Sequence, residues 1–407
     1  MPGPLAHVRV LDLSRVLAGP WAGQNLADLG AEVIKVERPR VGDDSRAFGP
    51  PWVKDKQGRP TKDSAYFTAA NRGKKSVTVN IATAGGQALI RSLTGACDVL
   101  IENYKHGDLA RYRLGYDDLR AVNPRLIYCS VTGFGQTGPY RDHPGYDFMI
   151  QGMGGMMSIT GEPDGAPGGG PQRAGVPIAD IITGMYASIA ICAALVNRAE
   201  TGKGQHLDLA LLDSQIALLA YQNTNYFSTG EPPGRIGNLH PNIVPYQPFK
   251  SSDGEVIVAC GNDNLFRKFC EAAGRPDLPA DPRFATNGKR VENRAEMARV
   301  IQDFFLKKTT AEWLALLEEA GVPNGPINNI AQVFEEPQVK ARGVKIELEH
   351  SAAGKLPLVA SPMRFSETPL EYRLPPPLLG EHTDEVLRGL LGKSDAEIAA
   401  LRAEGVV

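Results

Sequence analysis

The sequence has no excess of charge of either sign and few cysteines. Its 407 residues include 44 Lys and Arg, 46 Asp and Glu, and five scattered Cys that form no CxxC pair. A balanced charge leaves no basic stripe for nucleic acid or for an anionic membrane surface. An odd number of unpaired cysteines favours reduced structural thiols in a cytoplasmic protein. We therefore expect no nucleic-acid partner and a cytoplasmic location.

Long hydrophobic runs are also scarce. The longest, Ile181–Val196, is interrupted by Gly184 and is short for a membrane span. The N-terminal residues MPGPLAHVRVLDL lack the charged and then apolar layout of a signal peptide. Because the run is apolar on nearly every face, it is predicted to be a buried helix, and no membrane partner is expected.

Several common catalytic motifs are absent. The sequence contains no GxxxxGK[ST], no GxSxG and no HExxH, and its seven His residues do not pair at metal-binding spacings. The sequence therefore lacks the motifs that nucleotide hydrolysis, serine hydrolase chemistry and zinc chemistry require, and no metal site is expected. Gly133–Gly138 matches GxGxxG, but Pro139 and Pro144 prevent the prompt helix that a dinucleotide site requires. This segment is predicted to be a ligand-binding loop instead.

Six strand-like runs alternate with helical segments. The runs are 8–13, 31–37, 77–81, 98–102, 126–131 and 205–211. This alternation predicts an α/β fold with a doubly wound, mostly parallel, Rossmann-like sheet in a large domain, joined to a smaller α+β domain. The expected boundaries are a large domain over 1–212, a linker helix over 213–229, a small domain over 230–335, and a C-terminal part, 336–407, that returns to the large domain.

One carboxylate, Asp180, opens the apolar helix, where it could be an N-cap or a reactive group. Glycines surround it in the sequence: Gly161, Gly165, Gly168–Gly170, Gly175 and Gly184. Bare backbone lets a bulky substrate approach and offers N–H groups to an oxyanion. A carboxylate in such a place can attack an activated acyl group. A flexible loop that ends in a capped helix remains the alternative.

Phrases along the whole chain carry a resemblance to a known family. They are LDLSRVLAGP, LADLGAEVIKVERP, NRGKKS, IENYKHGDLARYRLGY, NPRLIYCSVTGFGQTGP, VPIADIITG, RAETGKGQHLDLALLDS and LGEHTDEVL. The chain resembles the family III CoA-transferases, the group that contains formyl-CoA:oxalate and carnitine CoA-transferases. The resemblance implies that Asp180 is the catalytic nucleophile and forms an aspartyl–acyl anhydride and then an aspartyl–CoA thioester. It implies CoA thioesters as substrates, no prosthetic group and an interlocked homodimer. The dipole of the helix is expected to keep Asp180 ionised.

The resemblance also implies which residues contact CoA. They are Val16, Leu17, Ala18, Arg38, Val79, Asn80, Ile81, Ala82, Asn103, Tyr104, Lys105, Arg111, Thr132, Gly133, Phe134 and Gly135. Arg38 and Arg111 are the natural phosphate partners, because a guanidinium grips phosphate oxygens in pairs. Leu17 stands where the formyl-CoA enzyme has Gln, and Ala82 stands where it has Lys.

Related racemases of 2-methylacyl-CoA need a His as proton-relaying base in the phrase that here is Gly145-Tyr146-Asp147. Tyr is a poorer base near neutral pH, so transfer is favoured over racemisation. A non-catalytic CoA-binding protein of the same fold is a second alternative, and an NAD-dependent dehydrogenase is a distant third.

The acyl partners are suggested by the corner 237–246, which resembles the branch that handles succinyl-CoA and dicarboxylic acids. We expect succinyl-CoA as donor and a small dicarboxylate-like acid as acceptor. Five residues are candidates to hold the acids, and each could equally face water: Arg46, Tyr146, Arg173, Arg235 and His240.

Overall fold

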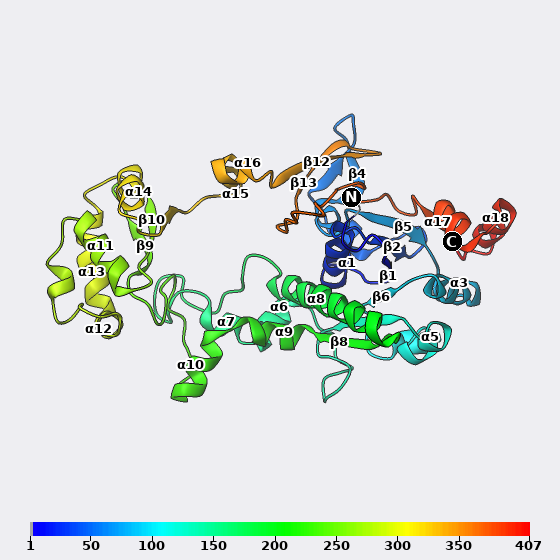
Figure 1. The fold of residues 1–407 in the computed structure, drawn as a ribbon, viewed down its shortest axis with the longest axis horizontal. Helices are drawn as coiled ribbons and strands as arrows, with labels where there is room; N and C mark the ends of the chain where they lie inside the picture. Colours follow the sequence, from blue (N-terminus) through cyan, green and yellow to red (C-terminus); the bar gives the residue numbers. More distant parts are fainter. Residues whose placement is uncertain (1–2) are drawn as a thin grey trace. The chain divides into compact units, whose positions relative to one another are not determined.

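The computed structural model describes residues 3–407 and divides them into two compact units (Figure 1). The larger unit contains the described residues up to Met156, Ala174–Gly230 and Gln338–Val407, and the smaller unit contains Met157–Arg173 and Glu231–Pro337. The large domain expected over 1–212 includes residues 157–173, which in the structure belong to the smaller unit. In the structure this segment bonds to the smaller unit, where Gly237 N donates to Gly161 O at 3.0 Å.

A six-stranded sheet forms the centre of the larger unit. Its strands are β1 (Arg9–Asp12), β2 (Glu32–Glu37), β5 (Lys74–Thr78), β6 (Val99–Glu102), β7 (Ile127–Thr132) and β8 (His206–Ala210). The order is β5-β2-β1-β6-β7-β8, and all neighbouring pairs are parallel. The predicted doubly wound parallel sheet is therefore confirmed. Its order reverses between β1 and β6, so a crevice opens beyond the carboxyl ends of these two strands.

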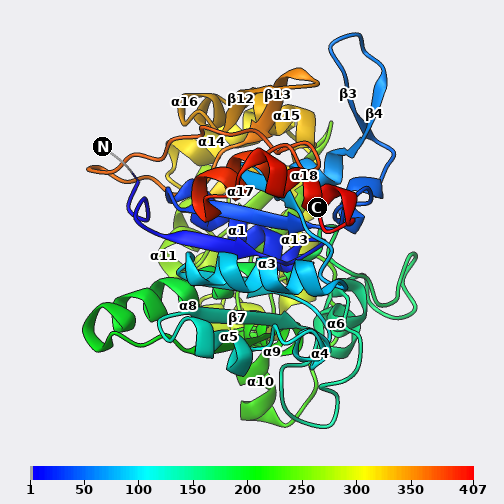
Figure 2. The same cartoon turned by 90° about the vertical axis from the view of Figure 1, so that its right-hand side faces the viewer.

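Helices cover both faces of this sheet. The helices α1 (Ala18–Asp28) and α8 (Ile178–Thr201) pack on one face, where Ala22, Val33 and Ile191 share a core. The helices α3 (Ala84–Gly95), α5 (Tyr116–Val122), α17 (Thr383–Leu391) and α18 (Asp395–Ala403) cover the other (Figure 2). The inner strands β1, β2, β6 and β7 place apolar side chains in the cores on both faces, as buried parallel strands require. A Cβ at Gly184 would lie 2.6 Å from Ala18 O, so this glycine lets α8 approach α1 closely.

The helix α8 differs from the prediction in two respects. Its inner face is buried, but Met185, Ile189 and Val196 are 46%, 62% and 71% exposed. At 24 residues it is also long and apolar enough to cross a membrane by length and composition, contrary to the expectation from its sequence. The inner face of α8 packs on α1 and the sheet, so α8 occupies the position of a core helix. The outer face has no covering element within the described larger unit.

Shorter elements complete the larger unit. They are η1 (Asp44–Ala47), β3 (Trp52–Lys54), β4 (Pro60–Ser64), α2 (Ala65–Thr68), α4 (Asp108–Arg111), α6 (Asp147–Met153), α9 (Leu211–Leu218), α10 (Tyr221–Thr229), β12 (Lys345–His350) and β13 (Gly354–Val359). The single helix expected after Asp213 is broken into α9 and α10, because Ala220 adopts a φ of 47° between them. The helices α7 (Met156–Ile159) and α16 (Pro337–Ala341) lie at the boundaries between the two units.

The smaller unit has the predicted α+β character. The strands β9 (Tyr246–Lys250), β10 (Glu255–Ala259) and β11 (Asn324–Pro326) form an antiparallel sheet. Its helices are α11 (Asp263–Ala272), α12 (Asn287–Glu292), α13 (Arg294–Phe305), α14 (Thr310–Glu319) and α15 (Ile330–Glu335). A capping box of Thr309 and Glu312 begins α14, and Phe305 stacks on Trp313 with ring centroids 4.1 Å apart.

Candidate active site

A cavity of about 220 Å³ lies in the larger unit where the strand order reverses. Residues at or after the carboxyl ends of β1, β2, β6, β7 and β8 contribute to its wall, together with the start of α8 and the loop before α6. The lining residues that matter below are Arg15, Val16, Leu17, Ala18, Asp44, Asn103, Tyr104, Lys105, His106, Thr132, Gly133, Arg141, His143, Tyr146 and Asp180. Such a crevice is where open α/β sheets bind their ligands.

Asp180 lies in the first turn of α8 but does not cap this helix. The cap comes from Asp147 at the start of α6: its Oδ1 accepts Ala179 N at 2.8 Å and Asp180 N at 3.4 Å. Its Oδ2 accepts Gln151 Nε2 at 2.7 Å, which fixes the orientation of the carboxylate. Within residues 3–407 no hydrogen bond is made to the Asp180 carboxylate, which faces the cavity. The interpretation of Asp180 as a cap is therefore wrong.

The electrostatic environment of Asp180 also differs from the expectation. Burial raises its pKa to about 7, and the negative charge of Asp147 adds to the shift. The helix dipole was expected to keep the group ionised, but Asp147 already occupies the positive end of α8. Removal from water and a neighbouring carboxylate are the causes of the raised pKa of Asp180. A carboxylate with such a pKa is a stronger base and nucleophile once it is ionised.

Tyr66, in α2, is a further neighbour of Asp180, and it is not among the residues predicted from the sequence. Burial raises its pKa to about 12, and the charges of Asp180 and Asp147 contribute. The phenol therefore remains protonated at neutral pH, and it lies within the electrostatic reach of both carboxylates.

The turn between β1 and α1 forms another part of the wall. The side chain of Asn103 braces it: Asn103 Oδ1 accepts Arg15 N at 2.8 Å and Asn103 Nδ2 donates to Arg15 O at 2.7 Å. The first N–H groups of a helix have no partner within that helix. In α1 they belong to Leu17, Ala18 and Gly19, since Pro20 has none. This places a helix N-terminus, which favours anionic groups, beside Asp180.

Arginines approach the cavity from two segments. Arg15 Nη1 donates to Asp44 Oδ2 at 2.8 Å, and Arg38 Nη2 donates to Asp44 Oδ1 at 2.6 Å, so one carboxylate holds both guanidinium groups. The guanidinium of Arg15 also lies 5.2 Å from the ring centroid of Tyr104, and its Nε is buried without a partner within the described chain. Arg15 and Asp44 are not among the residues predicted from the sequence, although Arg15 directly precedes the predicted contacts 16–18.

Comparison with known proteins decides the family. The model of CoA-transferase family III matches residues 5–383. This chain belongs to CoA-transferase family III. The succinate–glutarate CoA-transferase of Agrobacterium fabrum is 51% identical over 95% of this chain and 96% of its own length. The human succinyl-CoA:glutarate CoA-transferase is 44% identical over 99% of this chain and 90% of its own. The crystal structure of a CaiB/BaiF family protein from Brucella suis has a TM-score of 0.83 and 49% identity, and the match covers 96% of this chain and all of that one.

The resemblance noted in the sequence is thus confirmed, and the chain is a CoA-transferase. These relatives are named as transferases, which favours transfer over the racemase and non-catalytic alternatives. Within residues 3–407 no three His, Cys, Asp or Glu side chains gather in a possible metal site.

Eleven of the sixteen predicted CoA contacts of this transferase line two hollows of the larger unit. Val16, Leu17, Ala18, Asn103, Tyr104, Lys105, Thr132 and Gly133 line the main cavity. Arg38, Val79 and Ile81 line a hollow of about 20 Å³, which shares Arg15 and Tyr104 with the main cavity. The two hollows together form a candidate path for an extended ligand such as CoA.

The other predicted CoA contacts lie elsewhere in the unit. Asn80 N donates to Val406 O at 2.7 Å, so Asn80 is tied to the C-terminal residues, and Ala82 is exposed. The Arg111 side chain is 77% exposed and pairs with Asp108. Phe134 packs on Tyr140 and His143, and Gly135 N donates to Thr132 Oγ1 at 3.0 Å. None of these five residues lines the cavity.

Of the predicted substrate-binding residues, Tyr146 lines the cavity and is 70% exposed. Arg46 does not line it: the guanidinium is buried and donates to Glu37 at 2.7 and 2.8 Å and to Asp63 at 2.7 Å. An arginine with such buried partners has a structural role, so the structure contradicts the substrate role predicted for Arg46.

Arg173, Arg235 and His240 belong to the smaller unit. Arg235 pairs with Asp164, and His240 Nδ1 accepts Asn242 N at 3.0 Å. Their contact with substrate stays a prediction.

Proposed function

We propose that this enzyme transfers CoA from succinyl-CoA to a small dicarboxylic acid such as glutarate. The names of the relatives at 51% and 44% identity support these substrates. The observation that carries the proposal is the Asp180 carboxylate, which faces the cavity of a CoA-transferase and accepts no hydrogen bond within residues 3–407. A carboxylate in this position is available to react with a thioester.

The proposed reaction has four steps. An oxygen of ionised Asp180 attacks the carbonyl carbon of succinyl-CoA, the C–S bond breaks, and CoA thiolate leaves a mixed anhydride. The thiolate then attacks the Asp180 carbonyl carbon, which forms an aspartyl–CoA thioester and releases succinate. The acceptor carboxylate attacks this thioester and regenerates the thiolate and a new anhydride. The thiolate finally attacks the acceptor acyl carbon, which yields the new acyl-CoA and free Asp180.

The residues around Asp180 suit these steps. The N–H groups at the start of α1, carried by Leu17 and Ala18, can stabilise an oxyanion that develops beside Asp180. Arg15 and Arg38 can bind the phosphates of CoA, because guanidinium groups form paired hydrogen bonds to phosphate oxygens. Asp44 holds both arginines ready for this contact.

A panel of acids tests the proposed substrates. The enzyme is incubated with succinyl-CoA and, in turn, glutarate, itaconate, citramalate, a sulfinate analogue, oxalate and acetate, and the CoA esters are identified by mass spectrometry. We expect a new CoA ester with at least one four- to six-carbon dicarboxylate, at a kcat/KM about 100-fold above that for acetate. Failure with every dicarboxylate, whatever acetate does, would refute the substrate proposal.

We also propose that the active form is a homodimer. The support is the outer face of α8, where Met185, Ile189 and Val196 lie exposed in one apolar stripe. Contiguous apolar surface of this kind marks interaction sites. Sedimentation velocity is expected to give a molar mass twice that of one chain across the micromolar range. A mass of one chain in fully active enzyme would contradict the proposal.

A further inference from the structure

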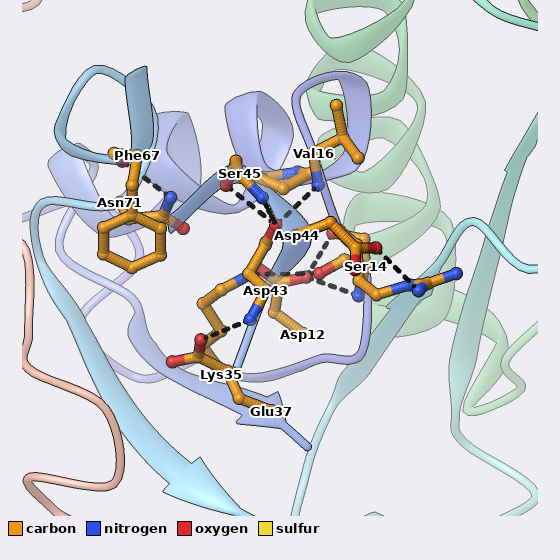
Figure 3. A network of polar contacts seen from close by, with 12 residues as sticks. Asp12, Ser14, Val16, Lys35, Glu37, Asp43, Asp44, Ser45, Phe67 and Asn71 are labelled. Carbon is orange, nitrogen blue, oxygen red and sulfur yellow. Dashed lines mark hydrogen bonds and ion pairs between the residues drawn. The ribbon is translucent and has the colours of Figure 1, made fainter. Parts of the chain in front are cut away.

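Four charged side chains are buried beside the turn between β1 and α1. They are Asp12 of β1, Lys35 of β2, Lys74 of β5 and Asp43, and each is at most 1% exposed. Figure 3 labels three of them, Asp12, Lys35 and Asp43. We refer to these four residues as the buried charge network. Replacing such a network by apolar residues is often neutral or stabilising, so stability alone is a weak explanation for it.

The hydrogen bonds of the network end on the backbone of the turn. Asp43 Oδ1 accepts Val16 N at 3.1 Å, and Lys35 Nζ donates to Ser14 O at 3.0 Å. Asp12 Oδ1 accepts Ser14 N at 3.0 Å, and Lys74 Nζ donates to Pro20 O at 2.8 Å. The contacts therefore reach the backbone on both sides of Leu17 and Ala18, the residues that line the cavity.

The ion pairs connect these contacts to one another. Lys35 Nζ lies 2.8 Å from Asp43 Oδ2, and Lys74 Nζ lies 2.8 Å from Asp12 Oδ2. Both carboxylates also bond to Ser side chains nearby, since Ser45 Oγ donates to Asp43 Oδ1 at 2.7 Å and Ser14 Oγ donates to Asp12. Neither lysine can move without breaking a contact to the turn.

The turn that the network holds has an unfavourable backbone conformation. Val16 has a φ of 69°, in the left-handed region that β-branched residues rarely adopt. Such a conformation persists only when the surrounding structure enforces it, and it is concentrated at functional sites. The turn is also tight: a Cβ at Gly19 would lie 2.3 Å from Ser14 Cβ. The hydrogen bond from Val16 N to Asp43 is the direct restraint on the strained residue.

Asp43 is suited to this restraint because it is ionised. Burial alone would raise its pKa, but the charge of Lys35 and the hydrogen bonds from Lys35 and Ser45 lower it to about 2. Its own backbone N–H donates to Glu37 Oε2 at 2.9 Å, which fixes the position of the residue. A charged acceptor forms a stronger hydrogen bond to an N–H group than a neutral one does.

We propose that Asp43, paired with Lys35, is a positioning residue for CoA transfer: it holds Val16 in the left-handed conformation and so keeps Leu17 and Ala18 in place beside Asp180. This inference rests on the proposed function, because the turn matters only if a CoA ester binds there. Asp43 itself touches no substrate and acts through the backbone of the turn.

The test is a double-mutant cycle between Asp43→Asn and Val16→Gly. Asp43→Asn is expected to lower kcat/KM for acyl-CoA about tenfold or more per folded enzyme. Val16→Gly removes a side chain that lines the cavity, so its own kcat/KM serves as the reference for the second arm of the cycle, and Gly adopts a positive φ without strain. Adding Asp43→Asn to Val16→Gly is expected to lower kcat/KM less than about threefold, because the turn then no longer depends on Asp43. If Asp43→Asn lowers kcat/KM by the same factor in wild type and in the Val16→Gly variant, the proposal is overturned.

Asp28→Asn is the matched control. Asp28 is another buried acid, and it pairs with Arg72 at the end of α1 remote from the turn. This variant is expected to lower the melting temperature yet to leave kcat/KM within about twofold of wild type. Equal losses of activity in Asp28→Asn and Asp43→Asn would show a merely structural role for Asp43. Should Asp43→Asn fail to fold, Asp43→Glu keeps the charge beside Lys35 and displaces only the acceptor, and the same rescue by Val16→Gly is required.

The dissociation constant of CoA separates this inference from the proposed function. If wild type transfers no CoA to any acid, the proposed function fails, and the cycle is then read by calorimetric titration with CoA. Asp43→Asn is still expected to weaken CoA binding about tenfold, with recovery in the double variant. CoA affinity equal in wild type and Asp43→Asn, in an inactive wild type, would overturn the positioning role as well.

Discussion

Replacing Asp180 with alanine is expected to abolish CoA transfer, with kcat reduced about 10⁴-fold or more, while CoA stays bound. The reason is that every proposed bond change passes through this carboxylate, which faces the cavity without a hydrogen bond within residues 3–407. Its neighbour Asp147 already caps α8, so removing the Asp180 side chain leaves the helix start intact. The measurement combines steady-state kinetics, calorimetric titration with CoA and thermal unfolding of the variant.

Arg15→Ala is the matched variant, and it is expected to affect KM where Asp180→Ala affects kcat. Arg15 is held against Asp44 and Tyr104 at the junction of the two hollows, so its loss is expected to raise KM for acyl-CoA about tenfold with kcat little changed. In wild type, hydroxylamine added during turnover should modify Asp180 alone, as shown by peptide mass spectrometry. Transfer by Asp180→Ala above about 1% of the wild-type rate, or hydroxylamine modification elsewhere only, would refute the covalent route.

The sheet could be predicted from the sequence because each strand carries its own apolar pattern. The exception is the third strand, which was expected over 77–81 and in fact begins at Lys74. Lys74 and Ser76 are polar and therefore concealed the start of the strand. They are buried because Asp12 of β1 and Glu37 of β2 supply their partners, at 2.8 and 2.6 Å. A partner from another strand leaves no trace in the local pattern.

The candidate site shows the same limit. The position of Asp180 could be predicted from an acid at the head of an apolar helix, but its environment could not. Whether that acid caps the helix depends on Asp147, which reaches α8 from another helix through tertiary packing. Arg46 likewise looked available for a substrate, because its surroundings were an irregular segment of the sequence. The fold of that segment places Glu37 and Asp63 around the guanidinium.

The outer face of α8 illustrates a different limit. The apolar pattern predicted a buried surface, but a pattern cannot state whether the covering element belongs to the same chain. Met185, Ile189 and Val196 stay exposed in the larger unit, so the assumption that all faces are buried within one chain was wrong. The same pattern remains consistent with the proposed homodimer.

Replacing Asp147 with asparagine is expected to move the acid limb of the pH–activity profile to lower pH. Asparagine keeps an oxygen that can accept the N–H groups of Ala179 and Asp180, but it removes the negative charge that helps raise the pKa of Asp180. Asp180 must be ionised to attack, so kcat/KM of wild type should fall about tenfold per pH unit below a pKa of about 7. With a lower pKa, the variant should retain a larger share of its plateau rate at pH 6 than wild type does.

Asp147→Ala separates the charge from the cap. It removes the negative charge as well, but it also leaves two N–H groups at the start of α8 without their acceptor, which is expected to lower stability by about 0.5–2 kcal/mol. Because Asp180 is anchored in that turn, the plateau of kcat should fall about tenfold in Asp147→Ala and much less in Asp147→Asn. Wild type, Asp147→Asn and Asp147→Ala share all other ionisable groups of the cavity. A difference between the acid limbs of their pH–activity profiles therefore reports on Asp147. An acid limb at the same pH in all three would show that the charge of Asp147 does not act on Asp180, and burial alone would then account for its raised pKa.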